Sequence, residues 1–319
     1  MDIETSAKVA QALTGPIEKL IDTVGMGIGK MSDGLAKLYE PIHMDRMAKT
    51  MRKNIDMPTL YDKDGIVIDT RDFQEIYKRT MSRMEFQELR KQQNIENVIK
   101  ESYNELKDVE CVSDEPVDSD WVSRFFNSVE NIGNEEIQKI WGRMLAGEIK
   151  SPNTYSFRTM EILKNMTTKE IELFQKLASI CISINNDYFI SSDVGILEKF
   201  GLTFSDLILL EECGLFSVQE LSINPAITEN KASILSQGRY QSFMYLKKAG
   251  IKKLTYNVFR LSKSACQLVD ILSIEKNNEY FFEIIRELIR LNQDINIEVY
   301  ETIPVGENVI RFKPVDIKL

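Results

Sequence analysis

The sequence predicts a mainly α-helical protein whose C-terminal part is a smaller, winged-helix-like α+β region. Apolar residues recur every three or four positions through most of residues 1–180, which is the spacing of amphipathic helices. After residue 186, short alternating or β-branched runs appear between further helical stretches, which is typical of strands. With 319 residues the chain has the length of two or three domains.

Composition limits the classes of function. Hydrophobic residues make up 43% of the chain and charged residues 28%, as in globular proteins. Lys and Arg number 40 against 49 Asp and Glu, so the formal net charge is −9. The single histidine is His43, so a His-rich metal site and an HExxH hydrolase are both excluded. We therefore expect no metal site, no cofactor and no enzymatic activity.

The cysteines and the N-terminus point to a cytoplasmic location. Charged residues interrupt any signal-peptide core near the start, and no run of 18 apolar residues predicts a membrane-spanning helix. Each cysteine stands alone, without CxxC spacing. We expect all four to be small buried hydrophobes in a reducing cytosol; they are Cys111, Cys181, Cys213 and Cys266.

Residues 1–55 are predicted to form an amphipathic, Gly- and Met-rich arm. Its apolar spacing is broadly helical, and Gly15-Pro16 should break or kink the helix. Three alternating glycines suit either the close approach of two helices or a lipid-adjacent segment. This segment is interpreted either as a flexible amphipathic arm in solvent or as a segment that contacts a membrane or forms an oligomeric pore. The three glycines are Gly25, Gly27 and Gly29.

A basic stretch closes this arm. Residues 43–53 contain several methionines and carry four basic side chains against Asp45, a local charge of +3. Basic stripes favour anionic lipids and methionines make adaptable partner surfaces, while a solvated helix face is the alternative. If this stretch contacts anionic lipids, the protein would lie at the periphery of the inner membrane. The candidate lipid or partner contacts are Arg46, Lys49, Arg52 and Lys53.

Residues 71–180 are predicted to form a helical domain after a turn-rich linker over residues 56–70. Its first helix, residues 71–107, is the longest amphipathic stretch and is typical of an oligomerisation element. Asp118 or Ser119 and then Asn134 are N-caps of the next helices, and Thr167 with Glu170 has the spacing of a capping box. The following helices should end near residue 180.

Residues 186–319 are predicted to form the α+β domain. Two helices followed by strands resemble the winged-helix topology. A run of lysines would lie at the wing, where phosphate contact is a plausible use and a solvated loop is the alternative. The candidate nucleic-acid or partner contacts are Lys247, Lys248, Lys252 and Lys253.

One motif block stands out within the helical domain. Residues 120–125 read D-W-x-x-R-F, residues 141–148 read W-x-R-x-L-A-G-E, Pro152 follows, and residues 156–159 read S-x-R-T. Over about residues 108–180 this order resembles an uncharacterised bacterial family known only as a domain of unknown function. More distantly, W-x-R-x-L-A resembles the abortive-infection alpha family of antiviral proteins. The resemblance implies a place in prophage or defence islands and supplies no active site.

The residues of this block also have a physical interpretation. Trp121 and Trp141 are expected to anchor the core. The arginines could pair with acidic residues on neighbouring helices through bidentate contacts that lysine cannot make. The alternative is an arginine-lined pocket that binds an anion or a nucleotide signal. The arginines are Arg124, Arg143 and Arg158, and their expected acidic partners are Glu148 and Asp120.

The functional hypothesis is a bacterial antiviral-defence protein of the abortive-infection type. It would act by oligomerisation and by binding a membrane or a partner protein, without catalysis. The expected partners are further copies of the chain, a defence-system protein and an anionic membrane. The alternative is a DNA-binding winged-helix regulator of a prophage or defence locus that uses the lysine run.

Overall fold

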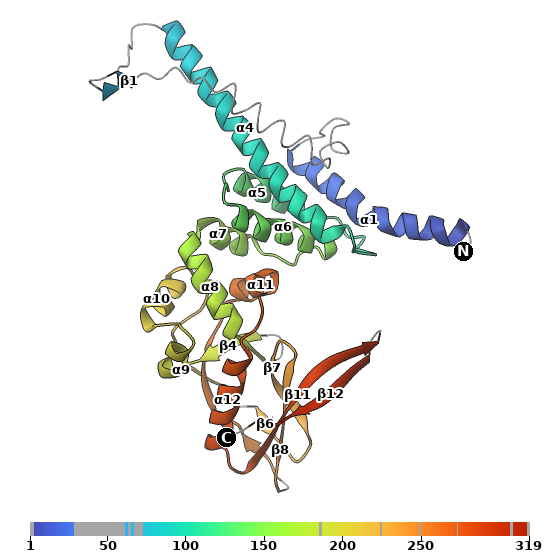
Figure 1. Cartoon of the computed structure of the whole chain (residues 1–319), viewed down its shortest axis with the longest axis vertical. Coiled ribbons are helices and arrows are strands. Elements are labelled where there is room, and N and C mark those ends of the chain that lie inside the picture. Colours follow the sequence, from blue (N-terminus) through green and yellow to red (C-terminus); the bar gives the residue numbers. More distant parts are fainter. Residues whose placement is uncertain are drawn as a thin grey trace. The chain divides into compact units, whose positions relative to one another are not determined.

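A computed structural model describes residues 3–28, 61–62, 65–66, 73–184, 187–223, 225–248, 250–272, 274–306 and 309–317. The chain divides into two compact units, Met1–Met160 and Glu161–Leu319 (Figure 1). The fold is α+β, which corrects the predicted mainly α class. The reason is an eight-stranded antiparallel sheet that organises the second unit.

The first unit is almost entirely helical. Asp118 caps α5 by accepting a hydrogen bond from the backbone amide of Trp121 at 2.8 Å, and Asn134 caps α6. Of the break or kink predicted at Gly15-Pro16, the break is absent, because the first helix continues through Pro16. The axis of this helix bends along its length (Figure 1). The elements are α1 (Ile3–Ile28), β1 (Tyr61–Asp62), β2 (Gly65–Ile66), α4 (Phe73–Leu106), α5 (Ser119–Val129), α6 (Glu135–Lys150) and α7 (Phe157–Asn165), which crosses the unit boundary.

Two glycines allow the helices of this unit to pack closely. A Cβ at Gly27 of α1 would lie 2.1 Å from the ring of Phe126 on α5. A Cβ at Gly142 of α6 would lie 2.5 Å from the Cβ of Glu101 and 3.0 Å from the backbone nitrogen of Ser102, both on α4. Neither contact leaves room for a side chain, so these are the points of closest helix approach.

The second unit mixes helices and strands. Its first helix begins with the predicted capping box, in which Thr167 and Glu170 satisfy each other's backbone amides. The elements are α8 (Thr168–Ile180), β3 (Ile182–Ile184), β4 (Asp187–Ser191), α9 (Val194–Lys199), α10 (Phe204–Glu212), β5 (Leu221–Ile223), β6 (Ala226–Ile227), β7 (Ala232–Gln237), β8 (Tyr240–Leu246), β9 (Lys252–Lys253), β10 (Tyr256–Arg260), α11 (Lys263–Leu272), α12 (Asn278–Leu291), β11 (Ile295–Gly306) and β12 (Val309–Val315).

The sheet has the order β12-β11-β8-β7-β3-β4-β10-β5. Its two four-stranded halves meet where β3 pairs with β7, with Ser183 opposite Ser236. In the second half, α9 and α10 connect β4 to β5, and β10 returns between these two strands. Two helices followed by strands are therefore present, but the predicted winged-helix-like motif accounts for only part of this sheet. The strands belong to one sheet that also contains β7, β8, β11 and β12.

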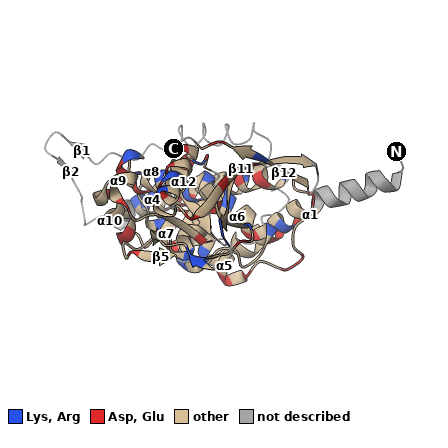
Figure 2. Cartoon of the chain, turned by 90° about the horizontal axis from the view of Figure 1, so that it is seen from below, with Lys and Arg blue, Asp and Glu red and all other residues tan. Residues whose placement is uncertain are grey.

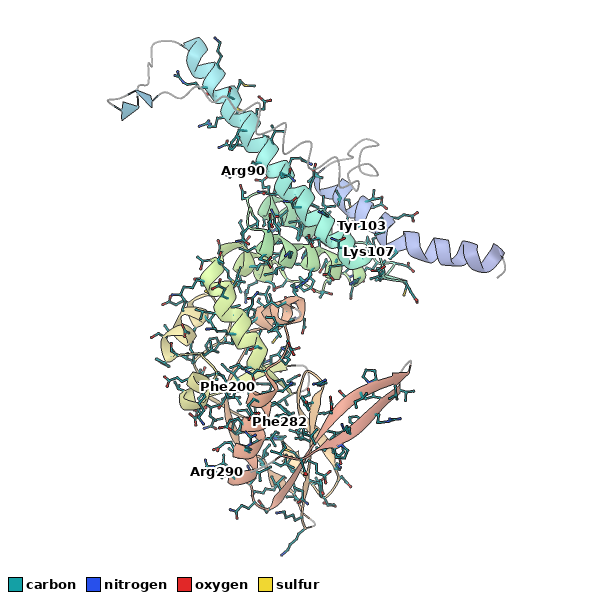
Figure 3. All side chains as sticks on the ribbon, in the orientation of Figure 1. Arg90, Tyr103, Lys107, Phe200, Phe282 and Arg290 are labelled. Atoms are coloured by element: carbon teal, nitrogen blue, oxygen red, sulfur yellow. The ribbon has the colours of Figure 1, made fainter. Side chains whose placement is uncertain are left out.

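One side of β8 and β11 is covered by α12. Tyr240 of β8 contacts Phe282 of α12 with ring centroids 5.0 Å apart, and α12 packs directly on β11 (Figure 3). Ser242, Met244 and Val299 alternate along the strands and are all buried. Because strand side chains alternate between faces, the residues between them point to the opposite face of the sheet.

Two other sequence predictions meet the structure here. All four cysteines are free, but only Cys181 is buried, which corrects the expectation that all are buried. Cys213 and Cys266 are half-buried, and Cys111, in the segment between α4 and α5, is exposed. None of the helices that the structure describes is long and apolar enough to cross a lipid bilayer.

Candidate functional site

The tryptophans of the motif block lie in the core of the first unit. Trp121 stacks on Phe125 with centroids 5.1 Å apart, and its indole nitrogen donates a hydrogen bond to the carbonyl oxygen of Tyr155 at 2.8 Å. The ring of Trp141 meets Phe125 edge-on at 5.4 Å and is fully buried. These rings supply packing between α5 and α6 rather than a surface for a ligand.

Glu148 is almost fully buried, and its carboxylate binds backbone amides of the following turn instead of the predicted arginine. Its Oε1 accepts a hydrogen bond from the backbone amide of Asn153 at 2.6 Å, and its Oε2 accepts one from Tyr155 at 2.9 Å. Loss of solvation raises the pKa of the carboxyl group, and the backbone hydrogen bonds partly oppose this shift. Asn153 adopts φ 68°, so the carboxylate secures a left-handed turn after α6.

The arginines of the block contact separate partners, which corrects the predicted pairs with Glu148 and Asp120. Arg143 forms an ion pair with Glu105 of α4 at 3.2 Å. Arg124 places its guanidinium 4.3 Å from the ring centroid of Phe157. Arg158 is exposed on α7, and Asp120 is exposed in the first turn of α5. The contacts of these side chains tie helices together; they do not converge on a common anion.

The lysine run is partly engaged within the second unit. Lys247 donates to the carbonyl oxygen of Gln293, and Lys252 pairs with Asp294. Lys248 and Lys253 are exposed. Basic and acidic residues are interspersed over the chain (Figure 2). A phosphate would have to compete with Asp294 for the ammonium of Lys252, which weakens the case for a nucleic-acid surface.

The nearby arginines do not extend this run into a basic stripe. Arg239 precedes β8 and pairs with Glu301, whereas the lysines follow the other end of that seven-residue strand, about 20 Å away. Arg260 makes two contacts of 3.1 Å with the carboxylate of Asp187. The predicted lipid or partner contacts Arg46, Lys49, Arg52 and Lys53, together with His43, lie outside the described residues.

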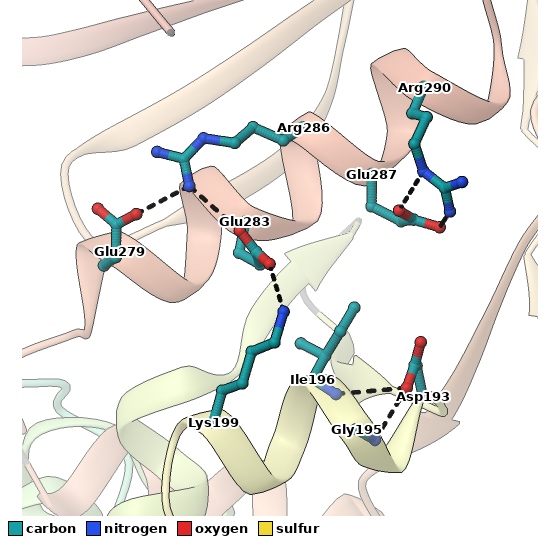
Figure 4. A network of polar contacts seen from close by, with 9 residues as sticks. All are labelled: Asp193, Gly195, Ile196, Lys199, Glu279, Glu283, Arg286, Glu287 and Arg290. Atoms are coloured by element: carbon teal, nitrogen blue, oxygen red, sulfur yellow. Dashed lines mark hydrogen bonds and ion pairs between the residues drawn. The ribbon is translucent and has the colours of Figure 1, made fainter. Parts of the chain in front are cut away.

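A cavity that the sequence did not reveal lies in the second unit. It has a volume of about 370 Å³ and is lined by residues from the ends of β4 and β10, from α9 and from α12. Three carboxylates reach it, from Asp193, Glu220 and Glu287. Each already has a partner. Glu220 accepts a hydrogen bond from Asn257. Asp193 caps α9, and Glu287 binds Arg290 (Figure 4).

The walls of this cavity are fixed by α9 and α12. Lys199 of α9 pairs with Glu283 of α12 at 2.9 Å, and Arg286 bridges Glu283 and Glu279 at 3.2 and 2.8 Å (Figure 4). These ion pairs are exposed, so each one contributes little free energy. The Lys199–Glu283 pair keeps α9, whose N-cap is Asp193, against α12, which carries Glu287, whereas both Arg286 pairs lie within α12.

The hydroxyl groups at the cavity are bound to one another. Ser191 Oγ lies 2.9 Å from the Tyr256 hydroxyl, and the Ser191 backbone amide donates to the Tyr280 hydroxyl at 2.8 Å. Burial raises the pKa of Tyr256 to about 12, so it stays protonated at neutral pH and cannot serve Ser191 as a base. The cavity therefore offers polar binding groups without an activated nucleophile.

Within the part of the chain that the structure describes, no group of three or more His, Cys, Asp or Glu side chains is arranged to hold a metal ion. The cavity could not be predicted from the sequence, because its lining residues come from segments up to 100 residues apart.

Comparison with known proteins finds one match. A protein family described only as "Protein of unknown function (DUF2806)" matches residues 78–285. This range contains the motif block, the lysine run and the cavity lining except Glu287 and Leu291. Neither the search of curated proteins nor that of solved structures gave a significant match.

Proposed function

The chain belongs to the DUF2806 family of proteins of unknown function, and we propose from its geometry that it is a non-catalytic, self-associating protein of bacterial antiviral defence. The abortive-infection type of action follows the resemblance of its W-x-R-x-L-A motif to the abortive-infection alpha family. One observation carries the proposal of self-association: a projecting ribbon in the second unit exposes large apolar side chains.

The ribbon is formed by β11 and β12. Residues Ile295–Glu301 of β11 pair with β8, but past Thr302 this strand pairs only with β12. Four large apolar side chains on the ribbon are 45–58% exposed. Ile310 and Phe312 share one face of β12, whereas Val309 lies on its other face, because side chains alternate along a strand. Exposed large apolar side chains gathered on a projecting strand pair are the feature that favours a contact surface here. The four are Val305, Val309, Ile310 and Phe312.

Charge favours a second copy of the chain as the occupant. The ribbon also exposes Arg311 and Lys313, whereas the whole chain carries a net charge of −9. The segment between α4 and α5 supplies an acidic counterpart, because Asp114, Glu115 and Asp118 are all exposed there. The exposed basic side chains of β12 and an acidic surface on the same chain favour a head-to-tail contact between copies.

Direct pairing of two β12 edges is less suitable. In an antiparallel pair centred on Phe312, Arg311 would face Lys313 of the other copy, and like charges opposite each other destabilise a sheet. Pro314 also removes a backbone donor from the edge.

Membrane binding by the first helix has less support than partner binding. Leu20 and Val24 of α1 are fully buried, and α1 packs against α5 and α6. An apolar face that is already covered inside the unit must be uncovered before it can enter a lipid bilayer. We therefore assign the contact function to the ribbon.

The test compares Ile310→Asp with the matched control Ile251→Asp. Ile251 is 78% exposed and belongs to neither β11 nor β12. Full-length wild type and the control should sediment as oligomers and reduce phage plating on cells that express them. Ile310→Asp should sediment as a monomer and lose protection. A monomeric wild type, or an Ile310→Asp variant that protects fully, would refute the proposal.

The DNA-binding alternative gains no specific observation. If it held, wild type would bind duplex DNA with an affinity that falls steeply with salt, and Lys248→Ala/Lys253→Ala would reduce that slope. Absence of salt-dependent DNA binding would leave the self-association proposal as the working description.

A further inference from the structure

The open face of β8 and β11 carries a cluster of aromatic side chains around an ammonium group. Phe243 and Tyr245 lie two residues apart on β8, and Tyr300 lies on the adjacent strand β11. Phe243 is directly opposite Glu298, which is two residues from Tyr300. All four side chains therefore share the face opposite to the one that α12 covers.

The ammonium group belongs to Lys231. This residue precedes β7, whose Ala232 pairs with Met244, so Lys231 is level with Tyr245. Its Nζ lies 4.6 Å from the ring centroid of Tyr300, 5.6 Å from that of Phe243 and 5.9 Å from that of Tyr245. Three rings within about 6 Å of a cation satisfy the geometry of cation–π binding.

A carboxylate completes the cluster. Glu298 binds the Lys231 ammonium, and it also accepts hydrogen bonds from the hydroxyls of Tyr245 at 2.7 Å and Tyr300 at 2.6 Å. The Tyr300 hydroxyl in turn accepts from Lys231 at 2.7 Å. The carboxylate is therefore oriented by two tyrosines that also present their rings to the cation.

The cluster is open to solvent. The side chain of Lys231 is 41% exposed and that of Glu298 37% exposed. Phe312 of β12, which meets Phe243 edge-on at 5.5 Å, is 45% exposed. A salt bridge that only stabilises the sheet needs a carboxylate and no aromatic rings. Three aromatic rings around the ammonium group are typical of sites that recognise ammonium ligands.

We propose that Phe243, Tyr245, Tyr300 and Glu298 form a receptor for the side-chain ammonium of a lysine, free or methylated, on a partner protein, and that Lys231 occupies it as a tethered competitor. The occupant seen in the structure defines the ligand chemistry, because it is itself a lysine ammonium. This inference rests on the cluster around Lys231 and not on the exposed ribbon tip, although Phe312 borders both surfaces.

The covalent connection between Lys231 and the receptor determines how easily an external ammonium can displace this side chain. Lys231 is on the same chain as the receptor, so its effective concentration there is on the order of millimolar. A partner lysine at micromolar concentration must displace it, and removal of Lys231 should therefore increase the affinity for an external ammonium. Nucleic acid is a poor occupant, because its phosphates would meet the Glu298 carboxylate.

The experiment measures binding of an Nε-trimethyllysine peptide and of tetramethylammonium to the full chain by calorimetry. Lys231→Ala should bind both at least about tenfold more tightly than wild type, which corresponds to about 1.4 kcal/mol. Lys231→Ala/Glu298→Gln should lose this gain. Lys253→Ala, which removes an exposed lysine elsewhere in the unit, should bind as wild type does.

Two further measurements keep the outcome decisive. Circular dichroism checks that each variant is folded; if Lys231→Ala is not, Lys231→Met retains the aliphatic stem and takes its place. Equal affinities of wild type and the folded Lys231 variant would overturn the proposal. Binding of phosphatidylcholine vesicles without binding of the peptide would overturn the assignment to a protein partner.

Discussion

The two units each contain an aromatic cluster, and the clusters differ in what surrounds the rings. In the first unit, Trp121, Phe125 and Trp141 pack at centroid distances of 5.1 and 5.4 Å and are buried. In the second, Phe243 and Tyr300 lie 5.5 Å apart on an open sheet face beside a carboxylate and an ammonium. The ring spacing is nearly the same in both places.

Burial decides what each cluster can do. The rings of the first cluster are removed from water, so their area contributes to the stability of the unit. The rings of the second remain partly exposed and combine a π face with charge, which contributes little to folding and suits recognition. The following changes test whether this division between stability and recognition holds.

The largest expected effect is the truncation of a buried ring. Trp141→Ala should lower the free energy of unfolding by about 3–5 kcal/mol, because it leaves a large cavity between α5 and α6. Phe312→Ala in the exposed cluster should lower it by about 1 kcal/mol or less. Urea denaturation of both variants checks this contrast, and equal losses would contradict it.

The second test adds a methyl group beside the buried cluster. Gly27→Ala should destabilise by about 1–3 kcal/mol, because the new Cβ would meet the Phe126 ring at 2.1 Å. Gly25, two residues earlier on α1, has nothing within 4 Å of its Cβ position. Gly25→Ala should stabilise by up to about 1 kcal/mol through helix propensity. Thermal unfolding should shift in opposite directions for the two variants.

The third test removes the charge that holds the turn beneath Trp121. Glu148→Gln should destabilise by about 1–3 kcal/mol, because an amide offers a single acceptor oxygen to the backbone amides of Asn153 and Tyr155. Glu170→Gln is the control, since Glu170 also accepts from a backbone amide but is exposed to water. Its loss in urea denaturation should be clearly smaller.

The smallest effect concerns acid sensitivity of the exposed cluster. Hydrogen bonds from Lys231 and the two tyrosines lower the pKa of Glu298 from 4.5 to about 2. The stabilisation by this ionised carboxylate is present above pH 4.5 and is lost as the pH falls toward 2. The difference in melting temperature between wild type and Glu298→Gln should shrink from pH 6 to pH 3. If this difference in melting temperature stayed constant between pH 6 and pH 3, ionisation of Glu298 would not be the source of the stabilisation.

Much of the secondary structure follows from local sequence signals. The capping box at Thr167 and Glu170 forms as predicted, and the helix predicted over 71–107 spans Phe73–Leu106. The sheet could not be predicted in the same way. Its halves join where Ser183 meets Ser236, 53 residues later, and alternation along one strand does not specify a distant partner.

The candidate sites show the same limit. The motif block drew attention to Glu148 as an arginine partner, but the backbone of the following turn takes both of its oxygens. The ammonium cluster combines position 231 with positions 243 and 300, which only the sheet register brings together. The spacing Glu298-x-Tyr300 on a strand was the available signal, and it is too short to identify a site without its neighbours.

The unequal pairing of β11 has a mechanical consequence. The strand is anchored to β8 up to Glu301, and Thr302 is held by the carbonyl of Arg239, while residues 303–306 extend about 13 Å further with β12 alone. A molecule bound at that tip would contact the same strand that carries Glu298 and Tyr300. Binding at the tip and ammonium binding at the cluster would then be coupled through β11.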